Sequence, residues 1–257
     1  MNLQGRGIYE GEAEGEVVKV DGSVSFLGDV DPATGEVFDE KDISGSIFVF
    51  PGGKGSTVGS YVIYQLKKEG IAPVAMINEL SETIVASGAI ISEIPLVDKI
   101  DLDLIREGDR VKVDGEKGVV ELKGVELHSE IGLFLEKDGS ILLRKEEVKG
   151  KTGKKWSILF ADKESQKSEK LLDQARLELS KEIKGEFEFL SKGGSVSVRE
   201  ANKIREIHPL LFKVKDDLDL GRSDERYRWT DPGEIKDMDT VPKLWESYLS
   251  VRDEYES

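Results

Sequence analysis

The stretch Phe50–Tyr61, FPGGKGSTVGSY, joins a short apolar run to a helical pattern through a glycine-rich turn. The segment that leads into it, Ser46–Phe50, is an apolar run after its first residue and predicts a buried strand. Residues 58–68 then carry apolar side chains at helical spacing, with Gly70 as a plausible stop. A strand, a glycine turn and a helix in this order place backbone N–H groups and the positive helix end around whatever binds at the turn.

Two polar residues make this turn a candidate site. Ser56 lies at or near the start of the expected helix, and Lys54 adds a cation beside it. On spacing alone a purely structural interpretation stays open, because Ser56 or Thr57 can serve as the helix N-cap. The order of Gly52, Gly53, Lys54 and Gly55 does not match the nucleotide-binding P-loop, so we do not expect nucleotide phosphates here.

The pattern around this turn predicts an α+β domain that ends near Gly124. Strands are expected at residues 15–20, 46–50 and 72–77, and a short helix is expected at residues 79–87. Residues 89–91 and 94–97 are apolar again. Residues 110–113 and 118–122 flank Asp114-Gly115, which predicts a β-hairpin with a type I′ turn. We therefore place a first domain at residues 1–124 and a second at residues 125–257.

The second half of the chain has a different pattern of expected strands and helices. A hairpin signal at Asp138-Gly139 lies between apolar runs at residues 131–135 and 141–143. A strand is expected at residues 156–160, and a long charged helix is expected at residues 164–184. Two or three strands follow, and an amphipathic helix closes the chain. This helix is expected at residues 241–255.

Composition limits the classes of function. The chain has 257 residues, no cysteine and a formal net charge of −15, with 38% hydrophobic and 35% charged residues. The negative charge argues against a nucleic-acid or anionic-membrane partner. Without thiolates the chain cannot itself ligate an iron–sulfur cluster, so a partner would have to supply one. No signal peptide or membrane-length apolar run is visible, and a cytoplasmic location is expected.

Four segments of the first half resemble the small subunit of the aconitase X family, in the same order along the chain. The likeness runs from about Gly5 to Leu122. The matching segments are Ser25–Gly35, Gly53–Val62, Ala86–Ile91 and Ile94–Asp98. The resemblance implies a swivelling β/β/α domain that docks on a cysteine-containing large subunit, which holds a [4Fe-4S] cluster.

The resemblance also implies a chemistry. Family members remove water from small hydroxy acids, and the expected substrate here is a phosphorylated one, (R)-5-phosphomevalonate, which gives trans-anhydromevalonate 5-phosphate. The family's catalytic serine falls on Ser56, which would accept the proton. We assign substrate binding to Lys54, Gly55 and Thr57, and no metal to this chain. Asn78 follows a strand, where a role in a turn is expected rather than one in binding substrate.

The second half resembles a Nudix domain, an α/β/α sandwich. In the family's glutamate-rich magnesium helix, Glu169, Glu178, Leu179 and Glu182 fit the pattern, whereas Lys163, Leu177, Lys181 and Lys184 depart from it. Replacing a ligand carboxylate by Lys181 puts an ammonium where a hard cation needs oxygen ligands. We therefore expect a Nudix fold without efficient hydrolysis. The two histidines, His128 and His208, are interpreted as structural.

Three hypotheses remain open at this point. The first is a dehydratase subunit with Ser56 as base. The second is a pyrophosphohydrolase with Glu178 and Glu182 on magnesium. The third is a non-catalytic interaction protein in which both halves are scaffolds.

Overall fold

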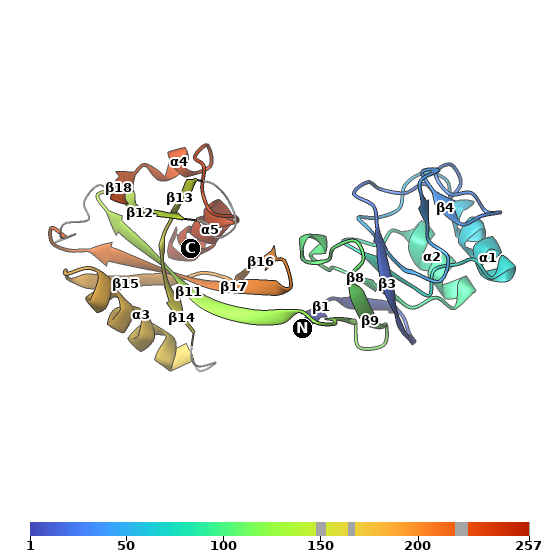
Figure 1. Ribbon diagram of the computed structural model, residues 1–257, viewed down its shortest axis with the longest axis horizontal. Helices are drawn as coiled ribbons and strands as arrows, with labels where there is room; N and C mark the ends of the chain where they lie inside the picture. Colours follow the sequence, from blue (N-terminus) through green and yellow to red (C-terminus); the bar gives the residue numbers. More distant parts are fainter. Residues whose placement is uncertain (148–152, 164–167, 219–225, 257) are drawn as a thin grey trace. The chain divides into compact units, whose positions relative to one another are not determined.

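The computed structural model describes residues 1–147, 153–163, 168–218 and 226–256 of the chain (Figure 1). The chain divides into two compact units, Met1–Glu126 and Leu127–Ser257. The boundary inferred from the sequence, after residue 124, lies just before strand β11, Glu126–Lys137. None of the helices in the described ranges is both long and apolar enough to cross a bilayer.

The first unit is built on an eight-stranded mixed sheet with the strand order β1-β10-β9-β3-β6-β7-β8-β2. Its central strands β3, β6, β7 and β8 run parallel, and the outer strands pair antiparallel. Strand β6 is buried along its whole length, as the apolar run predicts. The sheet strands are β1 (Asn2–Gln4), β2 (Arg6–Tyr9), β3 (Glu12–Lys19), β6 (Ile47–Phe50), β7 (Ala75–Asn78), β8 (Leu96–Asp98), β9 (Arg110–Asp114) and β10 (Val119–Leu122).

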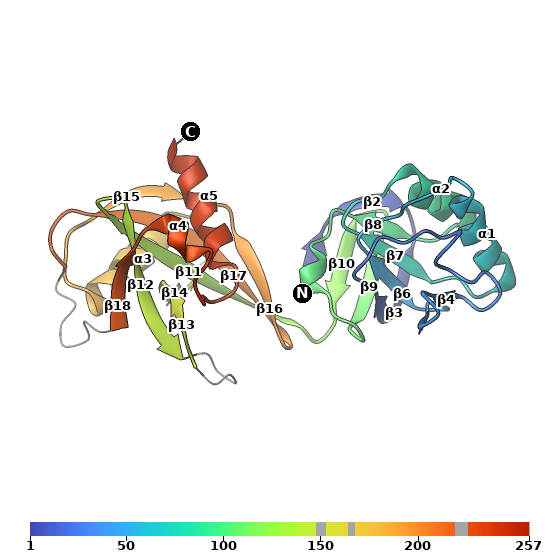
Figure 2. The same cartoon turned by 90° about the horizontal axis from the view of Figure 1, so that it is seen from above.

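Helices α1 (Gly59–Glu69) and α2 (Thr83–Ser92) lie side by side in this unit (Figure 2). Val62, Ile63 and Leu66 of α1 join one buried cluster with residues of β6 and α2. A Cβ added at Gly88 would lie 2.4 Å from Cδ1 of Ile63, so the close approach of the helices requires glycine there. Smaller elements complete the unit: β4 (Glu36–Val37), β5 (Lys41–Asp42) and the 3-10 helix η1 (Leu102–Leu104).

Helix α2 begins and ends later than the sequence predicts. The expected helix at residues 79–87 is wrong at its start, because the backbone N–H groups of Glu79 and Leu80 donate to the carbonyl of Pro51 and that of Ser81 donates to Asp98. These tertiary hydrogen bonds hold the segment outside the helix. The helix instead continues through the apolar residues 89–91 and ends at Ser92, where its C-cap, Glu93, has a left-handed backbone.

The turn predicted at Asp114-Gly115 is also wrong in type. Strands β9 and β10 pair with Asp114 opposite Val119, so residues 115–118 form the loop. The side chain of Asp114 accepts the N–H of Lys117 at 2.9 Å and closes this longer loop. Gly115 also donates its N–H to the carbonyl of Gly11. Contacts outside the hairpin therefore override the local preference for a type I′ turn.

The second unit has an eight-stranded sheet with the path β13-β12-β11-β17-β15, to which β14, β16 and β18 add as further partners. The hairpin predicted at Asp138-Gly139 is confirmed, since Lys137 pairs with Ser140 and both turn residues have positive φ. The expected strand at residues 156–160 is divided into two short strands. The strands are β12 (Ser140–Glu147), β13 (Lys154–Ser157), β14 (Leu159–Asp162), β15 (Phe187–Lys192), β16 (Val196–Glu200), β17 (Lys203–Val214) and β18 (Tyr227–Thr230).

Helices cover both faces of this sheet, and the alternation of side chains along the strands explains why (Figure 1). Leu133 and Phe212 pack in the cluster that contains α3 (Ser168–Glu182). Phe134 and Leu211, one residue away in each strand, pack in the cluster that contains α5 (Leu244–Glu256). The predicted α/β/α sandwich and the α+β class are therefore confirmed. A short helix, α4 (Pro232–Ile235), precedes α5.

Candidate functional site

The glycine-rich turn between β6 and α1 presents Ser56 to solvent. Lys54, Gly55, Ser56 and Thr57 are all exposed, and Gly55 has a φ of +92°, which favours glycine. The Oγ atom of Ser56 accepts the backbone N–H of Val58 at 3.3 Å. The four residues assigned from the sequence thus lie together on one surface loop.

The start of α1 leaves several donors free at this loop. The assigned N-cap, Val58, has no side-chain cap hydrogen bond, but Oγ of Ser56 accepts the N–H of Val58 in the turn that precedes α1, as the structural alternative predicts for a capping serine. In the described part of the chain, the backbone N–H groups of Gly55, Ser56 and Thr57 donate to no other group. Unpaired N–H groups at a helix N-terminus favour an anion.

The loop is held from below by residues that the sequence analysis missed. Glu82 accepts the N–H of Gly53 with 2.5 Å between Oε2 and the nitrogen. A Cβ added at Gly52 would lie 2.8 Å from the carbonyl oxygen of Leu80, so the turn packs tightly on the segment before α2. Val24 pairs with the same turn, since its N–H donates to Gly52 and its carbonyl accepts from Lys54.

An ion pair with a buried carboxylate in turn fixes the segment that carries Glu82. Arg6 donates to the fully buried carboxylate of Asp98 through Nε at 2.9 Å and Nη2 at 2.6 Å. Burial raises the pKa of Asp98, whereas the hydrogen bonds from Arg6 and from the N–H of Ser81 lower it. The hydrogen bonds outweigh the burial, so the pKa of Asp98 lies below its ordinary value. Asn78 is also buried, and it bonds the carbonyl of Phe50 and the hydroxyl of Ser81. Asn78 therefore shapes the turn, as expected.

Lys54 is not free in this structure. Its Nζ atom lies 3.4 Å from Oδ2 of Asp29, and the same oxygen accepts the N–H of Ser25 at 2.9 Å. The ammonium is half-exposed, and exposed pairs of this kind are weak. Lys54 can consequently exchange Asp29 for an anionic ligand at modest cost in free energy.

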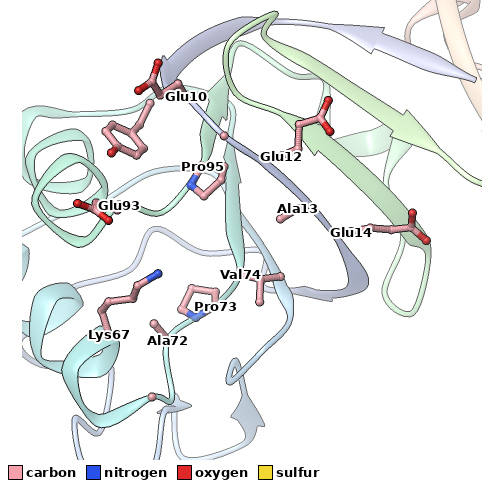
Figure 3. Close-up of a pocket in the computed structure, with 13 residues that line it drawn as sticks. Glu10, Glu12, Ala13, Glu14, Lys67, Ala72, Pro73, Val74, Glu93 and Pro95 are labelled. Carbon is pink, nitrogen blue, oxygen red and sulfur yellow. The ribbon is translucent and has the colours of Figure 1, made fainter.

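A separate cavity of about 790 Å³ lies in the same unit, away from the Ser56 loop (Figure 3). Its lining comes from the β2–β3 connection, from residues 72–74 and from the C-terminal ends of α1 and α2. The carboxylates of Glu10, Glu12, Glu14 and Glu93 outnumber the ammonium of Lys67 in this lining, although Glu12 and Glu14 pair with Lys112 and Arg110. This lining disfavours an anionic substrate.

In the second unit, the candidate magnesium ligands are occupied by cations. Oε2 of Glu178 lies 3.1 Å from Nζ of Lys181, and Oε2 of Glu182 lies 3.5 Å from Nη1 of Arg144. Glu178 and Lys181 also line a cavity of about 280 Å³. Of Glu169 only the backbone, within α3, is described. These ion pairs compete with a metal ion for the same carboxylates.

Comparisons with known proteins match the two units of the chain separately. Residues 2–122 match the family model of the aconitase X swivel domain. A relative named "Phosphomevalonate dehydratase small subunit", from Methanocella arvoryzae, is 50% identical over 131 residues, which cover 48% of this chain and 99% of the relative.

Two solved structures accompany these matches. The aconitase X holo-form of Thermococcus kodakaraensis is 53% identical and covers 48% of this chain and 98% of its own, with a TM-score of 0.47. A Nudix hydrolase from Nitrosomonas europaea is 18% identical and covers 49% of this chain and 88% of its own, with a TM-score of 0.39. The second likeness concerns the fold alone.

Proposed function

The chain belongs to the aconitase X family, and from this premise we propose that it is the small subunit of a hydro-lyase that dehydrates a small phosphorylated hydroxy acid. The proposed substrate is (R)-5-phosphomevalonate and the proposed product is trans-anhydromevalonate 5-phosphate. The name of the relatives supports this choice of substrate. We place the reaction in the cytoplasm.

The observation that carries the proposal is the exposed hydroxyl of Ser56 beside free N–H groups at the start of α1. Dehydration takes a proton from the carbon next to the carboxylate and hydroxide from the neighbouring carbon, which leaves a double bond and water. We assign the proton acceptor to Oγ of Ser56. A serine hydroxyl is a weak base, and the positive helix end together with the loop N–H groups stabilises the alkoxide that it must become.

The same environment favours the transition state. Negative charge that develops on the substrate carboxylate is stabilised by preorganised N–H donors, here those of Gly55, Ser56 and Thr57. Lys54 adds a cation once it leaves Asp29, and we assign it to a substrate carboxylate or phosphate. We assign Gly55 and Thr57 to binding through their backbone N–H groups.

We propose that the hydroxide acceptor comes from outside this chain. A [4Fe-4S] cluster supplies a Lewis acid for a departing hydroxyl group, and cysteine thiolates are its usual ligands. The chain contains no cysteine, so its residues fit a subunit that faces a cluster rather than one that holds it. We propose that a cysteine-containing large subunit carries the cluster.

Exposed apolar side chains near the loop fit such a partner. Val58 and Tyr61 lie at the start of α1, and Leu80 follows β7 where its N–H donates to Pro51. Leu27 continues from Phe26, which packs against Gly59. These four side chains are 47–69% exposed. A large subunit that covers them would exclude water from Ser56 and bury apolar area that is otherwise hydrated.

The decisive experiment is dehydration by the reconstituted complex. The chain is purified anaerobically with its large subunit, and conversion of 5-phosphomevalonate is followed by loss of substrate and appearance of the unsaturated product. We expect Ser56→Ala to abolish turnover and to leave complex formation intact. Ser23→Ala, at another exposed serine of the same unit, is the matched control. Near-normal turnover of the Ser56→Ala complex would refute the assignment.

For the second unit we propose a binding, docking or stabilising role rather than pyrophosphate hydrolysis. The ion pairs of Glu178 with Lys181 and of Glu182 with Arg144 support this choice. A hard cation such as Mg²⁺ requires a concentrated set of oxygen ligands, and each pair would have to separate first.

A further inference from the structure

A histidine and two carboxylates converge on the sheet of the second unit. His128 and Glu130 lie two residues apart on β11, so their side chains are on the same face of the sheet. Asp162, the last residue of β14, pairs directly opposite Glu130 in the antiparallel register. The ligand atoms of the three residues all lie within 4.8 Å of one another.

We propose that His128, Glu130 and Asp162 form a binding site for a divalent transition-metal ion such as Zn²⁺. This site is independent of the dehydratase proposal. It uses residues of the second unit, and none of the residues that we assign to the reaction takes part in it.

The spacing of the ligand atoms is that of a metal centre. Nε2 of His128 lies 3.2 Å from Oε1 of Glu130 and 3.4 Å from Oδ1 of Asp162. Zinc binds imidazole nitrogen and carboxylate oxygen at about 2.0–2.2 Å with tetrahedral angles, which puts neighbouring ligand atoms about 3.4 Å apart. The two distances from His128 match this spacing, and the third pair of ligand atoms lies within 4.8 Å.

The surroundings orient Glu130 for this role. Arg205 donates to Oε2 of Glu130 through Nε at 3.1 Å and Nη2 at 2.5 Å, which leaves Oε1 facing His128. Such outer partners fix the orientation of metal ligands. Glu130 is largely buried, with 14% of its side chain exposed, whereas His128 and Asp162 are 49% and 80% exposed. The site is therefore held in place at Glu130 and is open to solvent at His128 and Asp162, from which side an ion and water can enter.

The donor set selects the class of ion. One imidazole and two carboxylates favour Zn²⁺, and also Ni²⁺ and Cu²⁺, over Mg²⁺ and Ca²⁺, which require more oxygen ligands. Asp162 and Glu130 supply two carboxylates, of which Glu130 is also paired with Arg205, so the site keeps a net negative charge toward a divalent ion. The ion would tie the end of β14 to β11 and would stabilise the folded second unit, because a ligand that binds only the native state raises its stability.

Few other side chains of this protein can compete for zinc in the test, since the chain has no cysteine and only two histidines. Tag-free full-length chain is titrated with ZnCl₂ by calorimetry, and bound zinc is counted by mass spectrometry after dialysis. We expect one zinc per chain. We expect His128→Ala and Asp162→Asn each to weaken binding by at least the roughly 10- to 100-fold that even outer-sphere substitutions cost.

His208→Ala is the matched control and should retain the affinity of the wild type. Asp162→Asn alters a highly exposed, nearly isosteric group, so it keeps the test valid if the His128 variant folds poorly. Zinc should also raise the midpoint of thermal unfolding of the wild type but not of the Asp162→Asn variant. Absence of zinc binding by the wild type would overturn the proposal, and so would equal affinity in the wild type and the Asp162→Asn variant.

Discussion

The carboxylate of Glu82 accepts the backbone N–H of Gly53, with 2.5 Å between the two atoms. This bond joins the segment before α2 to the turn that carries Ser56. Two backbone hydrogen bonds with Val24 also hold this turn, but Gly52, Gly53 and Gly55 have no side chains that could pack. The conformation of the proposed active loop thus depends on a residue 26 positions after Ser56 in the sequence.

We predict that Glu82→Ala slows dehydration by the reconstituted complex. A hydrogen bond to a charged group contributes about 1.5–3 kcal/mol. If about 1.4 kcal/mol of this is lost from the positioning of the loop, kcat falls about tenfold. Glu82→Gln keeps an oxygen acceptor and should lose less. Steady-state kinetics of the two variants check the order.

The control for Glu82 is Glu69→Ala, at the opposite end of α1. It should leave kcat unchanged. Equal kcat values for Glu82→Ala and the wild type would show that the loop keeps its shape without this bond.

Lys54 provides a second prediction, because its ammonium is shared with Asp29 at 3.4 Å. If Lys54 binds an anionic group of the substrate, Lys54→Gln raises KM about tenfold, a loss of about 1.4 kcal/mol, with a smaller effect on kcat. Asp29→Asn removes the competing charge and should not raise KM. Separate determination of KM and kcat for both variants is the measurement.

Lys67→Gln, at the far end of α1, is the matched lysine control for this comparison. A Lys54→Gln complex with the KM of the wild type would exclude Lys54 from substrate binding.

Much of the fold follows from local pattern. The buried strand β6, the helix α1 and the hairpin at Asp138-Gly139 form where the apolar spacing and turn residues predict them. The predictions are wrong where groups distant in the sequence form hydrogen bonds with the backbone. Asp98 and Pro51 accept the N–H groups that would have begun α2 early, and no local signal in residues 79–82 reveals these partners.

The candidate site shows the same contrast between residues that the local sequence predicts and residues that only tertiary contacts bring in. The loop that carries Ser56 was identifiable because its residue types and order are themselves a motif. Glu82 was not, because a glutamate before a helix is ordinary in sequence and only the packing of β7 and α2 brings it to Gly53. The pairing of Glu182 with Arg144 likewise joins a helix to a strand far away in the sequence.

We predict that the chain does not hydrolyse nucleotide pyrophosphates in the presence of Mg²⁺. Lys181 and Arg144 neutralise the carboxylates of Glu178 and Glu182 that a magnesium site would need. Product analysis by chromatography, with an active Nudix hydrolase as positive control, checks this. Magnesium-dependent turnover that falls in Glu178→Gln but not in Glu188→Gln, an exposed glutamate of β15, would contradict the prediction.

A last prediction concerns His208 on β17, whose ring lies between opposite charges. Nε2 of His208 is 2.9 Å from Nζ of Lys163 and 3.0 Å from Oε2 of Glu206. Burial lowers the pKa of His208, Glu206 raises it, and Lys163 and Lys192 lower it, with a net direction below the ordinary value. Folding therefore favours the neutral imidazole of His208 over its protonated form.

The sign of the pH effect follows from this direction. A depressed pKa contributes stability that is present above the unfolded value, about 6.5, and is lost as the pH falls through the lower folded value. All three tryptophans, Trp156, Trp229 and Trp245, lie in the second unit, so their fluorescence reports on its unfolding alone. In urea titrations with chelator present, the free energy of unfolding should fall between about pH 7 and pH 5. His208→Gln should reduce that slope. An identical slope in the wild type and His208→Gln would show that His208 does not couple protonation to folding.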